Sequence, residues 1–164
     1  MAIVAGAHMP ALGEHEREQT GLELQATLVE LIDLSLLGKQ FHWSVVGPIF
    51  KPLHEQLDEL IDSWRELADT VAERAVALGV FPDGQATEVA HSSPIARVER
   101  GPLHDAHVVR ELTGRLAEVD ERMRDRMTRL AEIDSASEDV LIEVVRELEK
   151  QLWMLRSQLP DAGR

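Results

Sequence analysis

The sequence predicts an all-α protein, a four-helix bundle in which a long connection joins the second helix to the third. Apolar residues recur at helical spacing over four long stretches, and no convincing strand is present. The stretch from 80 to 103 holds three prolines and two glycines, and it is too long for a hairpin between neighbouring antiparallel helices. We therefore expect this connection to cross the length of the bundle.

The first two helices are bounded by residues that break helices. From Leu22 the apolar positions repeat at helical spacing to about Val45. Gly47-Pro48 ends this helix, because the residue before a proline avoids the helical region. Pro52 suits the first turn of the second helix, which we expect to end at Gly79.

The second half of the chain repeats the arrangement of two long helices. We expect a short helix inside the crossover near Thr87–His91, and a third long helix from about Leu103 to Ile133. The fourth begins at Ser135 and stops before Pro160. Ser135 and Glu138 have the spacing of a capping box, in which a serine and a glutamate satisfy each other's free amides.

Length and composition predict one compact domain. We place it at residues 19–159, between a flexible N-terminal tail at 1–18 and a short C-terminal tail at 160–164. The chain has no cysteine, which excludes disulfides and thiolate metal sites. No stretch approaches 18 apolar residues and no secretory signal is recognisable, so we expect a cytoplasmic protein without a membrane partner. Trp43 and Trp153 are expected in the core.

The segment from His42 to Glu73 carries most of the functional information. His54 and Asp58 are four residues apart, as are Asp69 and Glu73, so each pair lies on one face of a helix. The eleven residues from Asp58 to Asp69 make almost a whole number of turns, which puts all four side chains on one stripe. Imidazole nitrogen and carboxylate oxygen together suit iron, manganese or zinc.

The spacing divides this stripe into two half-sites. At 1.5 Å per residue, His54 and Glu73 lie about 28 Å apart along the helix, whereas metal–ligand bonds are about 2 Å long. One helix therefore cannot close both ends around one ion. Antiparallel pairing with a symmetry mate would bring His54 and Asp58 of one chain to Asp69 and Glu73 of the other, and a two-fold interface makes that contact twice. The sequence favours a metal centre shared between subunits.

Several motifs around these residues form a recognisable set. They are His-Trp-Ser-Val-Val-Gly-Pro at 42–48, a histidine twelve residues after the first, a carboxylate four later, Asp-x-x-x-Glu-Arg at 69–74 and Glu-Lys-Gln-Leu-Trp at 149–153. The set resembles the ferroxidase signature of the Dps family, the mini-ferritins. The resemblance extends from about Leu22 to Trp153 and fills all five expected ligand positions.

The resemblance implies a ferritin-like subunit that assembles into a hollow homododecamer in the bacterial cytoplasm. His42, His54 and Asp58 would bind iron together with the partner subunit's Asp69 and Glu73. The site would oxidise Fe(II) to Fe(III), with hydrogen peroxide as the expected oxidant, and the ferric mineral would be stored in the cavity.

Two further groups of acids are candidates for handling iron outside the ferroxidase centre. Glu55, Glu59 and Asp62 flank the ligand stripe and could nucleate the mineral. Glu121 and Asp125 could line an acidic pore through which iron enters.

A di-iron site inside the bundle is the first competing hypothesis. Such sites take a Glu-x-x-His motif from each of two helices. This chain has one such motif, Glu88 with His91, and it lies in the predicted crossover. The count and the position of the motif therefore argue against an in-bundle site.

A nucleoid-compacting shell that binds DNA is the second alternative, because some Dps relatives bind DNA through tails rich in Lys and Arg. The first eighteen residues here hold no lysine, one arginine and three glutamates, and the chain has a net charge of −13. That charge suits cations better than phosphates. Arg122, Arg126 and Arg129 share a helix face, but the interleaved Glu121 and Asp125 favour a self-paired surface. DNA binding is the weaker hypothesis.

Overall fold

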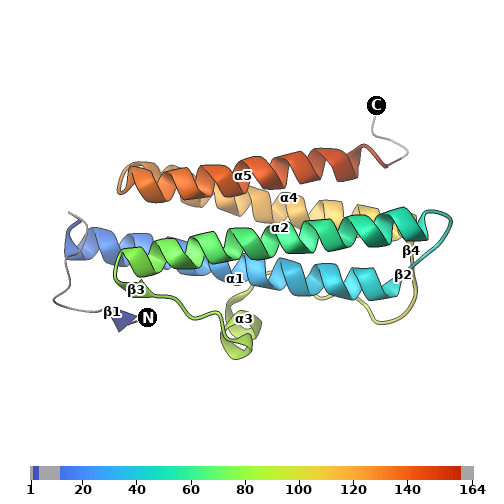
Figure 1. Ribbon diagram of the computed structural model, residues 1–164, viewed down its shortest axis with the longest axis horizontal. Helices are drawn as coiled ribbons and strands as arrows, with labels where there is room; N and C mark the ends of the chain where they lie inside the picture. The colour runs from blue at the N-terminus through green and yellow to red at the C-terminus, as the bar shows by residue number, and fades with distance from the viewer. Residues whose placement is uncertain (1, 4–11, 160–164) are drawn as a thin grey trace.

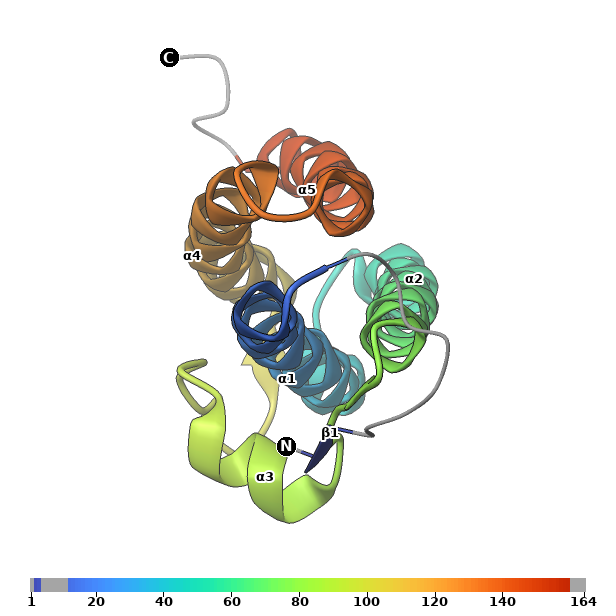
Figure 2. The same cartoon turned by 90° about the vertical axis from the view of Figure 1, so that its left-hand side faces the viewer.

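Two antiparallel helical hairpins stack on each other to form the bundle (Figure 1). The computed structural model describes residues 2–3 and 12–159. The end-on view shows the four long helices around a common core (Figure 2). They are α1 (Glu14–Ser44), α2 (Phe50–Ala77), α4 (Asp105–Ala131) and α5 (Ser135–Arg156). The predicted all-α four-helix bundle is confirmed.

The crossover between α2 and α4 contains the short helix α3 (Ala86–Ser92), as expected, and passes outside the bundle beside α1 (Figure 2). Four two-residue strands were not expected. In one pair, β1 (Ala2–Ile3) runs antiparallel to β3 (Val80–Phe81). In the other, β2 (Val45–Val46) runs parallel to β4 (Leu103–His104). Two residues are too few for an alternating pattern to show in a sequence.

Most helix boundaries agree with the sequence. Gly47 and Gly79 both have positive φ, at 136° and 75°, so each provides the backbone conformation that ends or redirects a helix. The start of α1 differs from the prediction, because the helix begins at Glu14 rather than Leu22. The acids of its first turn interact favourably with the helix dipole. Part of the predicted tail is therefore helical, and residues 4–11 of that tail lie outside the described residues.

The capping box predicted at the start of α5 is wrong. The residue that precedes the helix is Asp134, and Ser135 makes no capping hydrogen bond. The Asp134 carboxylate instead accepts hydrogen bonds from the hydroxyl of Ser137 and from the Arg74 guanidinium, the latter at 2.6 Å. The Asp134 carboxylate thus joins the first turn of α5 to the end of α2.

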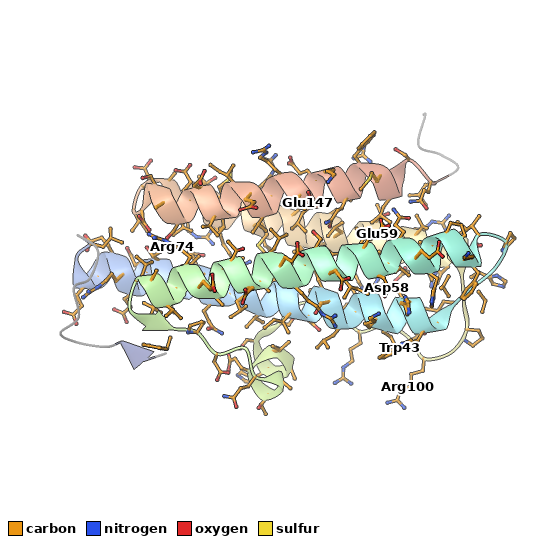
Figure 3. All side chains as sticks on the ribbon, in the orientation of Figure 1. Trp43, Asp58, Glu59, Arg74, Arg100 and Glu147 are labelled. Atoms are coloured by element: carbon orange, nitrogen blue, oxygen red, sulfur yellow. The ribbon has the colours of Figure 1, made fainter. Side chains whose placement is uncertain are left out.

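Leucine and valine side chains from all four long helices fill the core. Its largest side chain is Trp64, which is fully buried and donates a hydrogen bond from Nε1 to Oε1 of Gln151 at 2.7 Å. The prediction for the other two tryptophans is wrong, since Trp43 is 73% exposed and Trp153 is 65% exposed. Figure 3 shows Trp43 projecting outward from α1.

A network of ion pairs around the buried Glu30 joins α1 to α4. Glu30 is only 1% exposed, and its carboxylate binds the guanidinium groups of Arg122, at 2.7 Å, and Arg126. Arg129 binds Glu23 at 2.6 Å. These arginines therefore pair with α1, and the expectation that they pair with Glu121 and Asp125 on their own helix is wrong. Removing Glu30 would deprive the buried Arg126 of its nearest carboxylate, which is destabilising.

Within residues 2–3 and 12–159, no helix is both long enough and apolar enough to cross a bilayer.

Candidate metal centre

The hairpin of α1 and α2 brings three of the predicted ligands together. His42 lies in the last turn of α1, while His54 and Asp58 lie in successive turns of α2. One ligand atom from each of the three residues lies within 4.8 Å of the others. His42 is buried and the other two are half-buried, so the cluster opens to the surface at the corner between the helices.

Each imidazole is held by the backbone of the opposite helix. Nδ1 of His42 lies 3.1 Å from the carbonyl oxygen of His54, and Nδ1 of His54 lies 3.0 Å from the carbonyl oxygen of His42. A carbonyl oxygen only accepts hydrogen bonds, so both Nδ1 atoms act as donors. The lone pair of each ring is then on Nε2, which is left to bind a metal. The two rings stack with their centroids 3.5 Å apart.

Asp58 already has a cationic partner, Lys39, which was not among the predicted site residues. Its carboxylate contacts the Lys39 ammonium and lies 3.3 Å from Nδ1 of His42. The hydrogen bond from Lys39 is the main reason that the pKa of Asp58 lies below its ordinary value. The signal was present in the sequence, because Lys39 precedes His42 by three residues and so lies on the same face of α1.

The other predicted ligands, Asp69 and Glu73, are exposed on the same helix. The rise of the helix puts Asp69 about 16 Å from Asp58 along the axis. The single chain therefore does not bring all five residues together. It presents a cluster of three and a separate pair, which is the division that the spacing predicts.

The end of α2 that carries Glu73 is fixed by its neighbour Arg74. The Arg74 guanidinium donates from Nε to the Ser137 hydroxyl at 2.9 Å and binds Asp134. Figure 3 shows Arg74 at the end of α2 close to the start of α5. Burial acts to raise the pKa of Asp134, but the hydrogen bonds from Ser137 and Arg74 outweigh it and lower this pKa.

The three acids predicted to nucleate mineral are all exposed on α2, and two of them have cationic partners. Glu55 lies 3.5 Å from Lys51, and Asp62 lies 3.7 Å from Arg65. Within the described part of the chain, Glu59 forms no ion pair, and Figure 3 shows it on a different side of α2 from Asp58. Their role in nucleation stays a prediction.

An open groove of about 930 Å³ lies between α2 and α5, and the sequence did not predict it. Four acids and two basic residues are among its lining: Glu66, Asp139, Glu143, Glu147, Arg146 and Lys150. The acids come from two helices that are distant in the sequence, so no local pattern marks them. The pore candidates Glu121 and Asp125 are exposed on α4, and their role also stays a prediction.

Comparison with known proteins agrees with this fold. Residues 21–164 match the ferritin-like domain family, so the chain belongs to the ferritin-like proteins. It is also 34% identical over 163 aligned residues to the DNA protection during starvation protein of Mycolicibacterium smegmatis, a match that covers 94% of this chain and 85% of the relative. The chain therefore belongs to the Dps family.

Other relatives support the same assignment. DNA protection during starvation protein 2 of Deinococcus radiodurans is 33% identical over 151 residues, and the match covers 92% of this chain but only 63% of that relative. The solved structure of Mycobacterium smegmatis Dps superposes with a TM-score of 0.91 at 31% identity and covers 99% of this chain and 91% of that chain. DpsA14 from Streptomyces coelicolor gives a TM-score of 0.88 at 31% identity, with 95% and 94% of the two chains covered.

The contact between Lys39 and Asp58 generates a prediction about metal affinity. A metal ion that binds Asp58 must displace the ammonium group, so a substitution that keeps an unbranched side chain and removes its charge should favour the metal. We expect Lys39→Met to bind Zn²⁺ several-fold more tightly than the wild type in calorimetric titration. Lys51→Met is the matched control, because that lysine pairs with Glu55 and does not touch the cluster. Equal affinity in all three proteins would contradict the prediction.

Proposed function

We propose that this protein is an iron-storing mini-ferritin with ferroxidase activity. It oxidises Fe(II) to Fe(III) with hydrogen peroxide and stores the ferric mineral inside a hollow homododecamer in the bacterial cytoplasm. Reduction of one peroxide molecule to water takes two electrons, and two Fe(II) ions supply them. The effect is to remove iron and peroxide together before they form hydroxyl radicals.

The observation that carries this proposal is the incomplete cluster of His42, His54 and Asp58. Two imidazoles and one carboxylate are a donor set that Fe(II) accepts, and they leave coordination positions open. Both histidines are pre-oriented through Nδ1, which leaves Nε2 for the metal. Asp58 provides an anionic ligand once the Lys39 ammonium has moved aside. The open positions suit the partner subunit's Asp69 and Glu73 together with substrate.

The surface around the cluster supports its burial by another subunit. Trp43 is 73% exposed and directly follows His42, and Leu36, which is 54% exposed, lies two turns earlier on the same face of α1. Phe50 is 43% exposed, and its ring lies 5.0 Å from that of His54. Exposed apolar side chains gathered in one place are typical of an interface. We therefore assign this corner of the hairpin to the two-fold contact of the shell.

Shells that contain two kinds of mutant subunit test whether two chains share each site. His54→Ala removes a ligand from one half-site, and Glu73→Ala removes one from the other. When the two mutants meet across a two-fold axis, one site collects both lesions and the other keeps every native ligand. Random mixing makes half of the pairs mixed, so about a quarter of all sites are intact. Coexpression should therefore restore about a quarter of the peroxide-dependent rate of Fe(II) oxidation.

A second pair of mutants provides the control for this experiment. His54→Ala and Asp58→Ala both damage the same half-site, so every site in their mixed shells carries a lesion. Coexpression of this pair should restore nothing beyond the rates of the pure mutants. Absence of recovery in the His54→Ala and Glu73→Ala mixture, in shells of normal size, would argue against ligands drawn from two chains.

DNA compaction is the alternative function, and the relatives' names make it the natural comparison. The face of α4 that carries three arginines is a poor candidate for a DNA-binding surface. Glutamates of α1 already pair with all three of them, Arg122, Arg126 and Arg129. Binding of a phosphate backbone requires free positive charge and weakens steeply with salt. We expect no retardation of plasmid DNA in a gel at near-physiological salt, while Fe(II) oxidation proceeds in the same buffer. A salt-sensitive shift at sub-micromolar protein would overturn this expectation.

A further inference from the structure

Asp105 is a buried carboxylate that lies outside the metal cluster and yet contacts the corner that builds it. It is the first residue of α4 and is 8% exposed. Its Oδ2 accepts a hydrogen bond from the backbone N–H of Ile49 at 2.9 Å, and its Oδ1 accepts one from the N–H of Ala106 at 2.7 Å. Ile49 immediately precedes α2. One carboxylate therefore lies at the N-termini of two long helices, where negative charge is favoured.

The backbone of the corner is shaped to admit this carboxylate. Gly47 has a φ of 136°, a backbone conformation that residues with a side chain rarely adopt. A Cβ at this position would also lie closer than 3.0 Å to all three heavy atoms of the Asp105 carboxyl group. The Asp105 carboxyl group therefore packs directly against Gly47. In the sequence, Gly47 lies before α2 and Asp105 lies after the long crossover.

The residues just before Asp105 hold the other side of the same corner. Strand β4 pairs with β2, so that Val45 lies opposite Leu103 and Val46 opposite His104. The segment 103–105 therefore binds the end of α1 through its backbone and the start of α2 through the Asp105 side chain. His42 lies three residues before the first of these contacts, and His54 lies five residues after the last.

We infer that Asp105 is a positioning residue of the metal centre, an inference that rests on the proposed function. It holds α1 and α2 at the separation at which His42 and His54 each reach the carbonyl oxygen of the other. Those two bonds, at 3.1 Å and 3.0 Å, have ordinary lengths, and a shift of about 1 Å between the helices would lengthen them beyond the hydrogen-bond range. Both imidazoles would then lose the orientation that presents Nε2 to the metal.

The test uses Co²⁺ as a probe that binds nitrogen and oxygen ligands and has a spectrum sensitive to their geometry. Full-length protein in its assembled form would be titrated with Co²⁺ by calorimetry and by visible absorption, as wild type, Asp105→Ala and Asp105→Asn. We expect about tenfold weaker binding and an altered d–d spectrum in Asp105→Ala, the scale typical of lost support behind a ligand. Asp105→Asn should show a smaller loss, because its carboxamide keeps one acceptor but faces the second amide with a donor.

The control removes another acid from the first turn of a long helix. Glu138→Ala in α5 loses a comparable interaction with a helix dipole but lies away from the corner. It should bind Co²⁺ with wild-type affinity and spectrum. This comparison separates positioning of the histidines from a general loss of helix stability.

The outcomes distinguish this inference from the proposed function. Wild-type affinity and spectrum in Asp105→Ala would overturn the positioning role, and if that variant fails to assemble, the same result in Asp105→Asn would overturn it. If His54→Ala bound Co²⁺ as the wild type does, the proposed metal centre itself would be disproved. The positioning role of Asp105 would then be disproved with it.

Discussion

The rigidity of α2 is the constraint on which the rest of the structure depends. A straight helix puts residues four apart on one face, and it also keeps residues nineteen apart nearly 30 Å from each other. The first property joins His54 to Asp58 and Asp69 to Glu73. The second prevents one chain from closing these pairs around one ion. If both pairs belong to one metal site, as we propose, the second pair must come from another subunit, and metal binding then depends on assembly.

Contacts with the rest of the bundle fix both ends of α2. At the start of α2, the Asp105 carboxylate and the strand pair β2–β4 hold the corner next to His42 and His54. At its far end, Arg74 joins α2 to the loop between α4 and α5 next to Glu73. Both anchors come from the second hairpin, which the crossover connects to the first. The long crossover therefore does more than link helices, since its last residues pair with the segment that follows α1, next to His42.

The sequence was sufficient for features that repeat locally and insufficient for those that depend on which helix faces which. Helical periodicity and breaker residues predicted the four helices, the crossover and the stripe of ligands. The same periodicity could not say that Trp43 faces outward while Trp64 is buried, because an aromatic residue suits either a core or an interface. Arg126 was assigned to acids of its own helix, since the buried Glu30 lies 96 residues away in the sequence. The role of Asp105 could not be predicted for the same reason, since its contact with Ile49 spans 56 residues of the sequence. Lys39 differs, because its position three residues before His42 already puts it on the face of α1 that carries this histidine.

The sharing of one metal centre between two chains is the central claim, and diffraction from a crystal soaked anaerobically in Fe(II) tests it most directly. Anomalous difference maps collected on either side of the iron edge would locate the metal. We expect two peaks at each two-fold axis. Each should lie within bonding distance of His42, His54 and Asp58 of one subunit and of the partner subunit's Glu73. Peaks ligated by residues of a single chain, or none near His42 and His54, would contradict the central claim.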